Sequence, residues 1–272
     1  MSIRFRSLFT LAAALSLCAC QSNYTAYALT STGSIIKFDT STPTTISATV
    51  AVSGLSSGET LVQLSYRPED AQFYGITNDN LLCTVNADSG VATLVSSSAF
   101  SSDTLSDAAI SFDPVQDQLR VVSTEYNLRV SSSGTLAASN TKLAFDGSDS
   151  NSGKTPQVAA IAYTNPAAGA SSTTLYALDV TTQSLLRVGN SDASATTAVD
   201  SGDLHTVGSV GVSFTADAGL SIRSGSDTAY AALQQSGSGA VLYTIDLSTG
   251  AAAEVGSIGD GSQTLISLVL LP

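Results

Sequence analysis

Leu64-Ser65-Tyr66-Arg67-Pro68 is the stretch that decides the fold, because its pattern returns four times further along the chain. It is a short apolar strand that ends in an aromatic side chain and runs into a turn. The later copies are Ile110-Ser111-Phe112-Asp113-Pro114, Ile161-Ala162-Tyr163-Thr164-Asn165, Val212-Ser213-Phe214-Thr215 and, at the end of the sequence, Leu268-Val269-Leu270-Leu271-Pro272. Successive copies begin about 50 residues apart, which is the length of one blade of a β-propeller.

Further strands follow each of the first four copies. Second strands are expected at residues 73–76, 119–122, 175–178 and 229–232, and third strands at residues 81–86, 127–130, 185–188 and 241–246. Turn residues such as Asp88-Ser89-Gly90 then lead into a fourth strand. The N-terminal part has a second and a third strand, at residues 26–29 and 35–39, but no first strand before them.

The C-terminal copy provides the strand that the N-terminal unit lacks. A propeller has this need, because its ring leaves no open seam when the last strand completes the first blade. We therefore predict an all-β fold, a β-propeller of five four-stranded blades over residues 24–272, closed by pairing the C-terminal strand with the N-terminal blade. A six-bladed ring and an open solenoid are the alternatives, but a solenoid gives no reason for the termini to complement each other.

The repeated first strands also predict how neighbouring blades pack. Successive side chains of a strand alternate between its two faces. Large residues such as Leu64 and Tyr66 therefore share one face, and small residues such as Ser65 occupy the other. Large side chains of one blade can rest on small ones of the next, which allows close contact in a chain that has no Trp.

Three groups of segments resemble the bacterial family called domain of unknown function 4394. The first is Phe112-Asp113-Pro114 with Leu119-Arg120-Val121-Val122-Ser123 and residues 127–130; the second is residues 152–158 with Ala162-Tyr163-Thr164-Asn165 and residues 173–176; the third is residues 205–208, 211–212 and 218–219. The likeness covers residues 24–271. It implies a secreted or lipid-anchored propeller-like domain and no particular reaction, because the family has no assigned activity.

The N-terminus has the features of an export signal. Arg4 and Arg6 precede a short apolar run that is too short to span a bilayer. The run ends in Leu17-Cys18-Ala19-Cys20, which resembles a bacterial lipobox with a small residue before the acylated cysteine. We expect a signal peptide at residues 1–19, lipidation of Cys20, a tether at residues 20–23 and delivery to the outer membrane, facing either the periplasm or the cell surface. An ordinary secretory signal is the alternative.

Composition limits the partners and the means of stabilisation. Charged residues are 12% of the chain, hydrophobic residues 43%, and the net charge is −12. This excess of acid argues against nucleic acid as a partner and against a basic membrane-docking patch, so we expect membrane contact through the lipid alone. We also expect a monomer. Loss of Cys18 with the signal and acylation of Cys20 would leave Cys83 without a disulfide partner, so Cys83 is expected to be a small buried residue.

Catalytic and metal motifs are weak. His205 is the sole histidine, no nucleophile motif accompanies it, and one His with one free Cys excludes a histidine-based zinc site. We therefore name no catalytic residue and no required cofactor. Asp146, Asp149 and Asn151 form a candidate Ca²⁺ site in a short acidic segment, with a plain polar turn as the alternative.

The strongest ligand-binding candidates are charged residues near the expected axis. Arg67, Asp113, Thr164, Thr215 and Leu271 occupy the same position after the five first strands. Arg67 and Asp113 would form either an ion pair between adjacent blades or a polar ligand site at one mouth of the channel. Arg120 and Arg129 could add planar donors to that site. Arg120 replaces a tyrosine found in the other second strands, which indicates a specialised site or an ion pair with Glu125.

These features favour a lipid-anchored envelope propeller that acts as a binding or scaffold module for an unknown protein or small ligand. A hydrolase or lyase with a polar site at the channel mouth is one alternative. A structural component of the envelope or matrix is the other, suggested by low charge and a high content of Ser, Thr and Gly.

Overall fold

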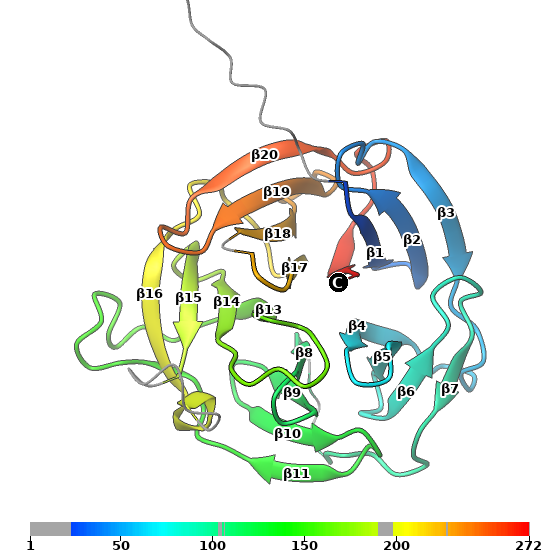
Figure 1. Cartoon of the computed structure of the whole chain (residues 1–272), viewed down its shortest axis with the longest axis horizontal. Coiled ribbons are helices and arrows are strands. Elements are labelled where there is room, and N and C mark those ends of the chain that lie inside the picture. The colour runs from blue at the N-terminus through cyan, green and yellow to red at the C-terminus, as the bar shows by residue number, and fades with distance from the viewer. Residues whose placement is uncertain (1–22, 103–104, 106, 190–197, 227, 272) are drawn as a thin grey trace, which may run out of the picture.

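The structure, a computed structural model, describes residues 23–102, 105, 107–189, 198–226 and 228–271. The predicted signal peptide, Cys20 and most of the tether lie outside the described residues. Five antiparallel sheets surround a common axis, so the chain is an all-β propeller with five blades (Figure 1). The predicted blade number and fold class are confirmed.

The strands of each blade follow one another from the axis outward. Blade 1 contains β21 (Leu265–Leu270), β1 (Thr25–Thr30), β2 (Ser34–Asp39) and β3 (Ile46–Ala51). Blade 2 contains β4 (Leu61–Arg67), β5 (Gln72–Thr77), β6 (Leu82–Val85) and β7 (Ala92–Leu94). Blade 3 contains β8 (Ala109–Asp113), β9 (Gln118–Val122), β10 (Asn127–Ser131) and β11 (Leu136–Ser139). Blade 4 contains β13 (Val158–Tyr163), β14 (Leu175–Asp179), β15 (Ser184–Val188), β16 (Asp203–Ser209) and β12 (Ala144–Phe145). Blade 5 contains β17 (Ala218–Ile222), β18 (Thr228–Leu233), β19 (Val241–Asp246) and β20 (Ala252–Ser257).

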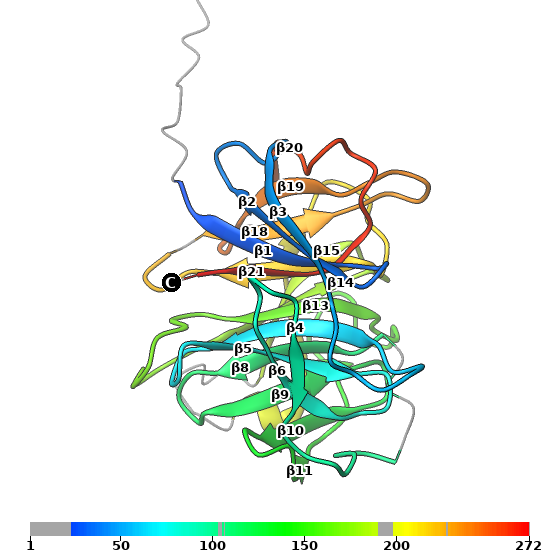
Figure 2. The same ribbon diagram turned by 90° about the vertical axis from the view of Figure 1, so that its right-hand side faces the viewer.

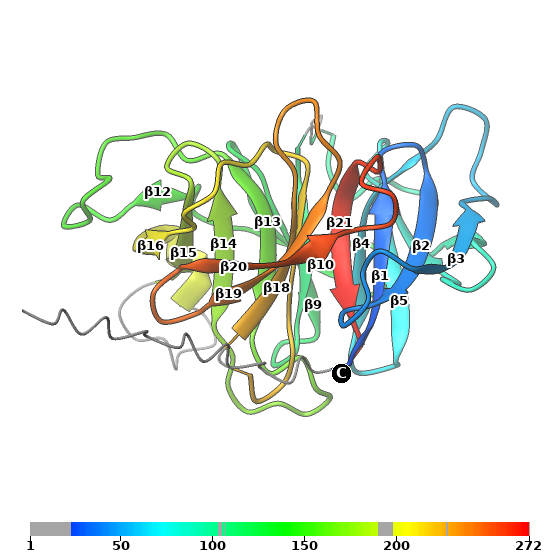
Figure 3. The same cartoon turned by 90° about the horizontal axis from the view of Figure 1, so that it is seen from above.

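The ring closes as the repeats predict. β21 pairs with β1 in antiparallel register, with Ala26 opposite Leu270 and Leu29 opposite Ser267. The two strands lie side by side, with the start of β1 and the end of β21 at the same face of the propeller (Figures 2 and 3). The C-terminal strand therefore completes blade 1.

One predicted inner strand is wrong. The fourth copy, residues 212–215, lies outside the strands, and β17 takes its place in blade 5. The backbone of Phe214 is instead held by the side-chain amide of Gln183, which accepts from its N–H at 2.7 Å and donates to its carbonyl at 3.1 Å. β17 passes so close to β21 that a Cβ on Gly219 would collide with the backbone of Leu268. Arg223, which follows β17, is therefore the true counterpart of Arg67, and Thr215 is not.

Blade 4 carries one more strand than predicted. β12 pairs in parallel with β16, with Ala144 opposite Asp203 and Phe145 opposite Leu204. This short strand covers the outer edge of the blade, and covered edges do not recruit other chains. Between β15 and β16, a short 3-10 helix at Ala198–Ser201 lies beside the same blade.

Neighbouring inner strands are joined through the small residues that the alternation places on one face. The hydroxyl of Ser65 accepts from Phe112 N at 3.3 Å, that of Ser111 from Tyr163 N at 3.4 Å, and that of Ser221 from Leu270 N at 3.0 Å. At two boundaries the serines are those that the repeats place on the small face, Ser65 and Ser111, and at the third the serine belongs to β17, which the repeats did not predict.

Cys83 lies in β6 and is fully buried, as expected. Burial raises the pKa of its thiol to about 12, and the thiol faces the carbonyl of Gly75 at 3.4 Å. Since the thiolate is the reactive form, we predict that a thiol reagent at pH 8 leaves Cys83 unlabelled in the native protein and modifies it stoichiometrically in denaturant. Mass spectrometry checks this, and rapid labelling of the native fold would contradict the packing of β6.

Candidate functional site

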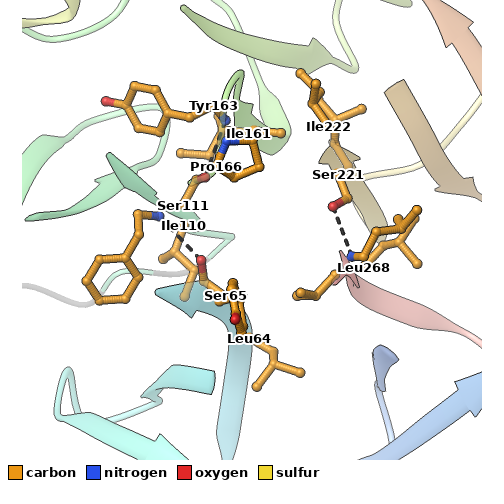
Figure 4. Close-up of a pocket in the computed structure, with 16 residues that line it drawn as sticks. Leu64, Ser65, Ile110, Ser111, Ile161, Tyr163, Pro166, Ser221, Ile222 and Leu268 are labelled. Carbon is orange, nitrogen blue, oxygen red and sulfur yellow. Dashed lines mark hydrogen bonds between the residues drawn. The ribbon is translucent and has the colours of Figure 1, made fainter. Parts of the chain in front are cut away.

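A ring of five aliphatic side chains, one from each inner strand, lines the propeller axis. The ring consists of Leu64, Ile110, Ile161, Leu220 and Leu268, all of them buried. All five line both axial cavities, of about 50 and about 10 Å³, and Figure 4 shows the lining of the first of these. The axis is therefore narrow and mostly apolar at its middle, with a depression on each side of the ring.

The larger depression, which we call the mouth, lies where the inner strands begin. It has a volume of about 370 Å³. Its apolar lining consists of Val62, Leu105, Ala108, Ala159, Ala216 and Ile266. Its polar lining consists of Gln63, Asn78, Asp107 and Asp217. These residues come from all five blades, because each inner strand or the loop before it contributes at least one side chain.

Two polar groups of the mouth have structural partners. Gln63 Nε2 donates to the carbonyl of Ile266 at 2.9 Å and so links blade 2 to blade 1. Asn78 accepts from Thr60 N at 2.8 Å. By contrast, Asp107 and Asp217 are exposed at the rim, and neither forms an ion pair with another described residue. The mouth thus has apolar walls and an acidic rim.

A buried hydroxyl lies below the mouth. Ser267 is 4% exposed, and its Oγ has no hydrogen-bond partner among the described residues. It lines the smaller axial cavity, which shares Gln63 with the mouth. A buried polar atom without a partner is uncommon in a native protein and marks a place where water or a ligand atom can bond.

The four charged residues singled out from the sequence lie outside the mouth, and only Arg120 and Arg129 share a partner. Arg67 is bound by the adjacent-blade carboxylate of Asp117, at 2.7 Å from its Nε, and by Asp70 and the hydroxyl of Tyr74. The predicted Arg67–Asp113 pair is wrong. Asp113 is buried and accepts from the backbone N–H groups of its own turn, including Val115 at 2.8 Å. Both residues end inner strands, at the opposite end of the axis from the mouth.

Arg120 and Arg129 meet on one carboxylate. Arg120 is 1% exposed and donates to Asp200 at 2.9 Å, and Arg129 reaches the other oxygen of Asp200 at 3.4 Å. Arg120 also donates to Asn127 at 2.9 Å and to the hydroxyl of Tyr163 at 3.3 Å. Although burial opposes its charge, the contacts with Tyr163 and Asp200 raise the pKa of Arg120. The expected Arg120–Glu125 pair is wrong, since Glu125 pairs with Lys142.

The Arg120 cluster is a variant of a contact found at another blade boundary. Arg120 lies opposite Arg129 on neighbouring strands, as Tyr27 lies opposite Lys37. Tyr27 and Lys37 both donate to Asp88 of the next blade, at 3.1 and 3.3 Å. In both cases two cross-strand donors hold one carboxylate of the neighbouring blade. Arg120, Arg129 and Asp200 therefore form a charged contact between blades 3 and 4, which we call the latch.

The calcium candidates are engaged in protein hydrogen bonds. Asp149 accepts from the backbone and hydroxyl of Thr206 at 2.6 and 2.8 Å, and Asp146 accepts from Ser148 N at 2.8 Å. Burial opposes ionisation of Asp149, but the hydrogen bonds from Thr206 lower its pKa overall. Asn151 Oδ1 accepts from Lys154 at 2.8 Å. Nowhere in the described part of the chain do three or more His, Cys, Asp or Glu side chains form a group that could hold a metal ion.

His205 lies on β16, and its Nε2 is buried without a hydrogen-bond partner among the described residues. Within the same described ranges, no helix has the length and apolar character needed to cross a membrane.

Comparisons with known proteins agree with the architecture. A family model with the description "Domain of unknown function (DUF4394)" matches residues 34–268. No curated protein matches the chain. A protein of unknown function from Bacteroides caccae is similar in structure, with a TM-score of 0.51, 11% identity and coverage of 92% of this chain and 99% of that one. TolB from Acinetobacter baumannii gives a TM-score of 0.43 at 12% identity, covering 88% of this chain and 54% of that one.

Proposed function

This chain belongs to the family described as Domain of unknown function (DUF4394), which assigns it no reaction, and we propose that it is a binding module that holds a small ligand in the mouth. The observation that carries the proposal is the mouth itself. It is a cavity of about 370 Å³, with mostly apolar walls and a few polar groups. Sites for small molecules share this size and composition.

The mouth is formed by the blades themselves. Its lining comes from all five blades, and the aliphatic ring below it is buried. Gln63 and Ile266 are joined by a hydrogen bond across the boundary between blades 2 and 1. A cavity that is formed before the ligand arrives costs less conformational entropy on binding than one assembled by loops.

We also propose that the module is attached to the outer membrane through Cys20, which the lipobox-like sequence supports. Tyr24 is fixed at the other end of the tether by its N–H bond to Thr40 Oγ1, at 3.1 Å. β1 begins beside the end of β21, at the face opposite the mouth (Figure 3). The residues between Cys20 and Tyr24 span at most about 14 Å when extended. Anchoring would therefore hold that face near the lipid and turn the mouth away from the membrane.

The binding proposal is tested by filling the mouth. Ala216→Trp places a large side chain in the cavity, and Ala253→Trp places the same side chain on the exposed face of β20 as a control. Calorimetric titration with hexylamine, hexanoate and hexanol provides three probes that share one alkyl chain. We expect saturable binding of at least one probe to the wild type and Ala253→Trp, and none to Ala216→Trp. Absence of binding by all three probes, or equal binding by both variants, would refute a ligand site in the mouth.

The anchor is tested separately in living cells. Palmitate labelling should disappear in Cys20→Ala and persist in Cys18→Ala. Persistence of the label in Cys20→Ala would refute lipidation at Cys20. It would not affect the proposal of a ligand site in the mouth.

A further inference from the structure

We propose that the ligand of the mouth is an amphipathic amine, in which a protonated amino group is attached to an apolar body. This inference rests on the proposed binding function and specifies its chemistry. The charges and the walls of the cavity support it.

The charges at the mouth are of one sign. Asp107 and Asp217 are the two charged residues in its described lining, and no Lys or Arg is among them. Asp107 precedes the inner strand of blade 3 and Asp217 precedes that of blade 5, with Ala159 of blade 4 in the same lining. A cation at the rim would thus have a carboxylate on two sides.

Asp107 and Asp217 differ in this respect from the acidic residues that form ion pairs elsewhere in the protein. Within the described ranges, the side chains that form ion pairs with acids elsewhere are Lys37, Arg67, Arg120, Arg129 and Lys142. None of these cations lines the mouth. The net charge of −12 adds a negative field around the whole chain, which attracts cations and repels anions.

The walls fit the apolar part of such a ligand. Val62, Leu105 and Ile266 provide aliphatic surface, and Ala108, Ala159 and Ala216 leave room between them. Each ligand methylene that is fully buried there should strengthen binding by about fourfold. Affinity is therefore expected to rise from butylamine to hexylamine, by about 16-fold if both added methylenes reach the walls.

A buried hydroxyl lies in the smaller axial cavity, next to the mouth. Ser267 Oγ has no partner among the described residues, and it lines that cavity, which shares Gln63 with the mouth. A hydroxyl can accept a hydrogen bond from a water or from a ligand donor that reaches past Gln63.

The decisive comparison uses the three hexyl probes at pH 7 and low salt, where the amine is protonated and the carboxylate ionised. We expect hexylamine to bind wild-type protein at least about tenfold more tightly than hexanoate, and more tightly than hexanol. Because exposed charges are screened by ions, raising the salt to about 0.5 M should weaken hexylamine and leave hexanol unchanged.

Neutralising the two carboxylates tests whether they are the source of the preference for an amine. The double variant Asp107→Asn/Asp217→Asn should bind hexylamine about tenfold more weakly and hexanol within twofold of wild type, as expected for two rim charges. Glu69→Gln/Glu254→Gln removes the same charge from exposed positions outside the mouth, and should bind both probes as wild type does. Circular dichroism and thermal melting verify that both variants fold.

The outcomes separate this inference from the function on which it rests. If hexanol or hexanoate binds as tightly as hexylamine, or if the Asn double variant keeps full affinity for hexylamine, the amine assignment is overturned and a ligand site in the mouth remains. If none of the three probes binds, the mouth is not a small-ligand site and both proposals are refuted.

Discussion

Arg120→Ala is expected to destabilise the folded protein by about 3–5 kcal/mol, the usual cost of removing one partner from a buried ion pair. Arg120 is 1% exposed, and its guanidinium joins blade 3 to Asp200 of blade 4. Its removal leaves Asp200 with the weaker contact to Arg129 and leaves Asn127, Asn140 and Tyr163 without their donor. Chemical denaturation followed by circular dichroism measures the loss.

Two comparisons make this result specific to the latch. Arg129 is partly exposed and contacts Asp200 at 3.4 Å, so Arg129→Ala should cost about 1 kcal/mol. Arg120→Ala combined with Asp200→Ala should cost less than the sum of the single changes, because the stranded carboxylate is removed together with its partner. A loss below about 1 kcal/mol for Arg120→Ala, or strict additivity, would show that the pair does not join the blades.

Deletion of residues 265–272 is expected to abolish folding of the monomer. β21 is the inner strand of blade 1 and buries Leu265, Leu268, Val269 and Leu270. Each large apolar side chain contributes about 1.5–3 kcal/mol when buried, so these four approach the whole stability of a typical domain. The deletion also opens β1 as an unpaired edge and removes one member of the aliphatic ring.

Far-UV circular dichroism and size-exclusion chromatography measure this effect. The truncated chain should lack a cooperative thermal transition, and a synthetic peptide of residues 265–271 should restore one when added in excess. A control deletion of Pro272 alone should unfold as the full chain does. A truncated monomer that unfolds cooperatively without the peptide would contradict the structural role of β21.

Much of the fold could be predicted from the sequence because the repeated strands carry their own alternation. Four of the five inner strands, and the pairing of the two termini, follow from apolar residues at every second position. The fourth copy could not be placed in this way, because residues 212–215 and 218–222 both alternate. The choice between them depends on tertiary contacts: Gln183 holds Phe214 outside the sheet, and Gly219 allows β17 to approach β21.

The functional site was harder to predict than the fold. Arg67 and Arg120 were chosen as candidates because they are charged. Their partners, Asp117 and Asp200, lie far along the chain and could not be identified from sequence spacing. The mouth was missed because its walls are alanines and ordinary aliphatic residues. A signal was nevertheless present, since Val62, Ala108, Ala159 and Ile266 each precede a member of the aliphatic ring by two positions. Once the ring is recognised, that spacing identifies the lining.

The claim on which the mouth, the aliphatic ring and the tether geometry all depend is that β21 is a permanent part of blade 1. Native-state hydrogen exchange of the backbone amides tests it without changing the sequence. Amides in the β1–β21 ladder should exchange only through global unfolding, as slowly as those of β9 in the middle of blade 3. Exchange in β21 that is orders of magnitude faster than in β9 would show that the ring opens in the native state, and the closed propeller would be refuted.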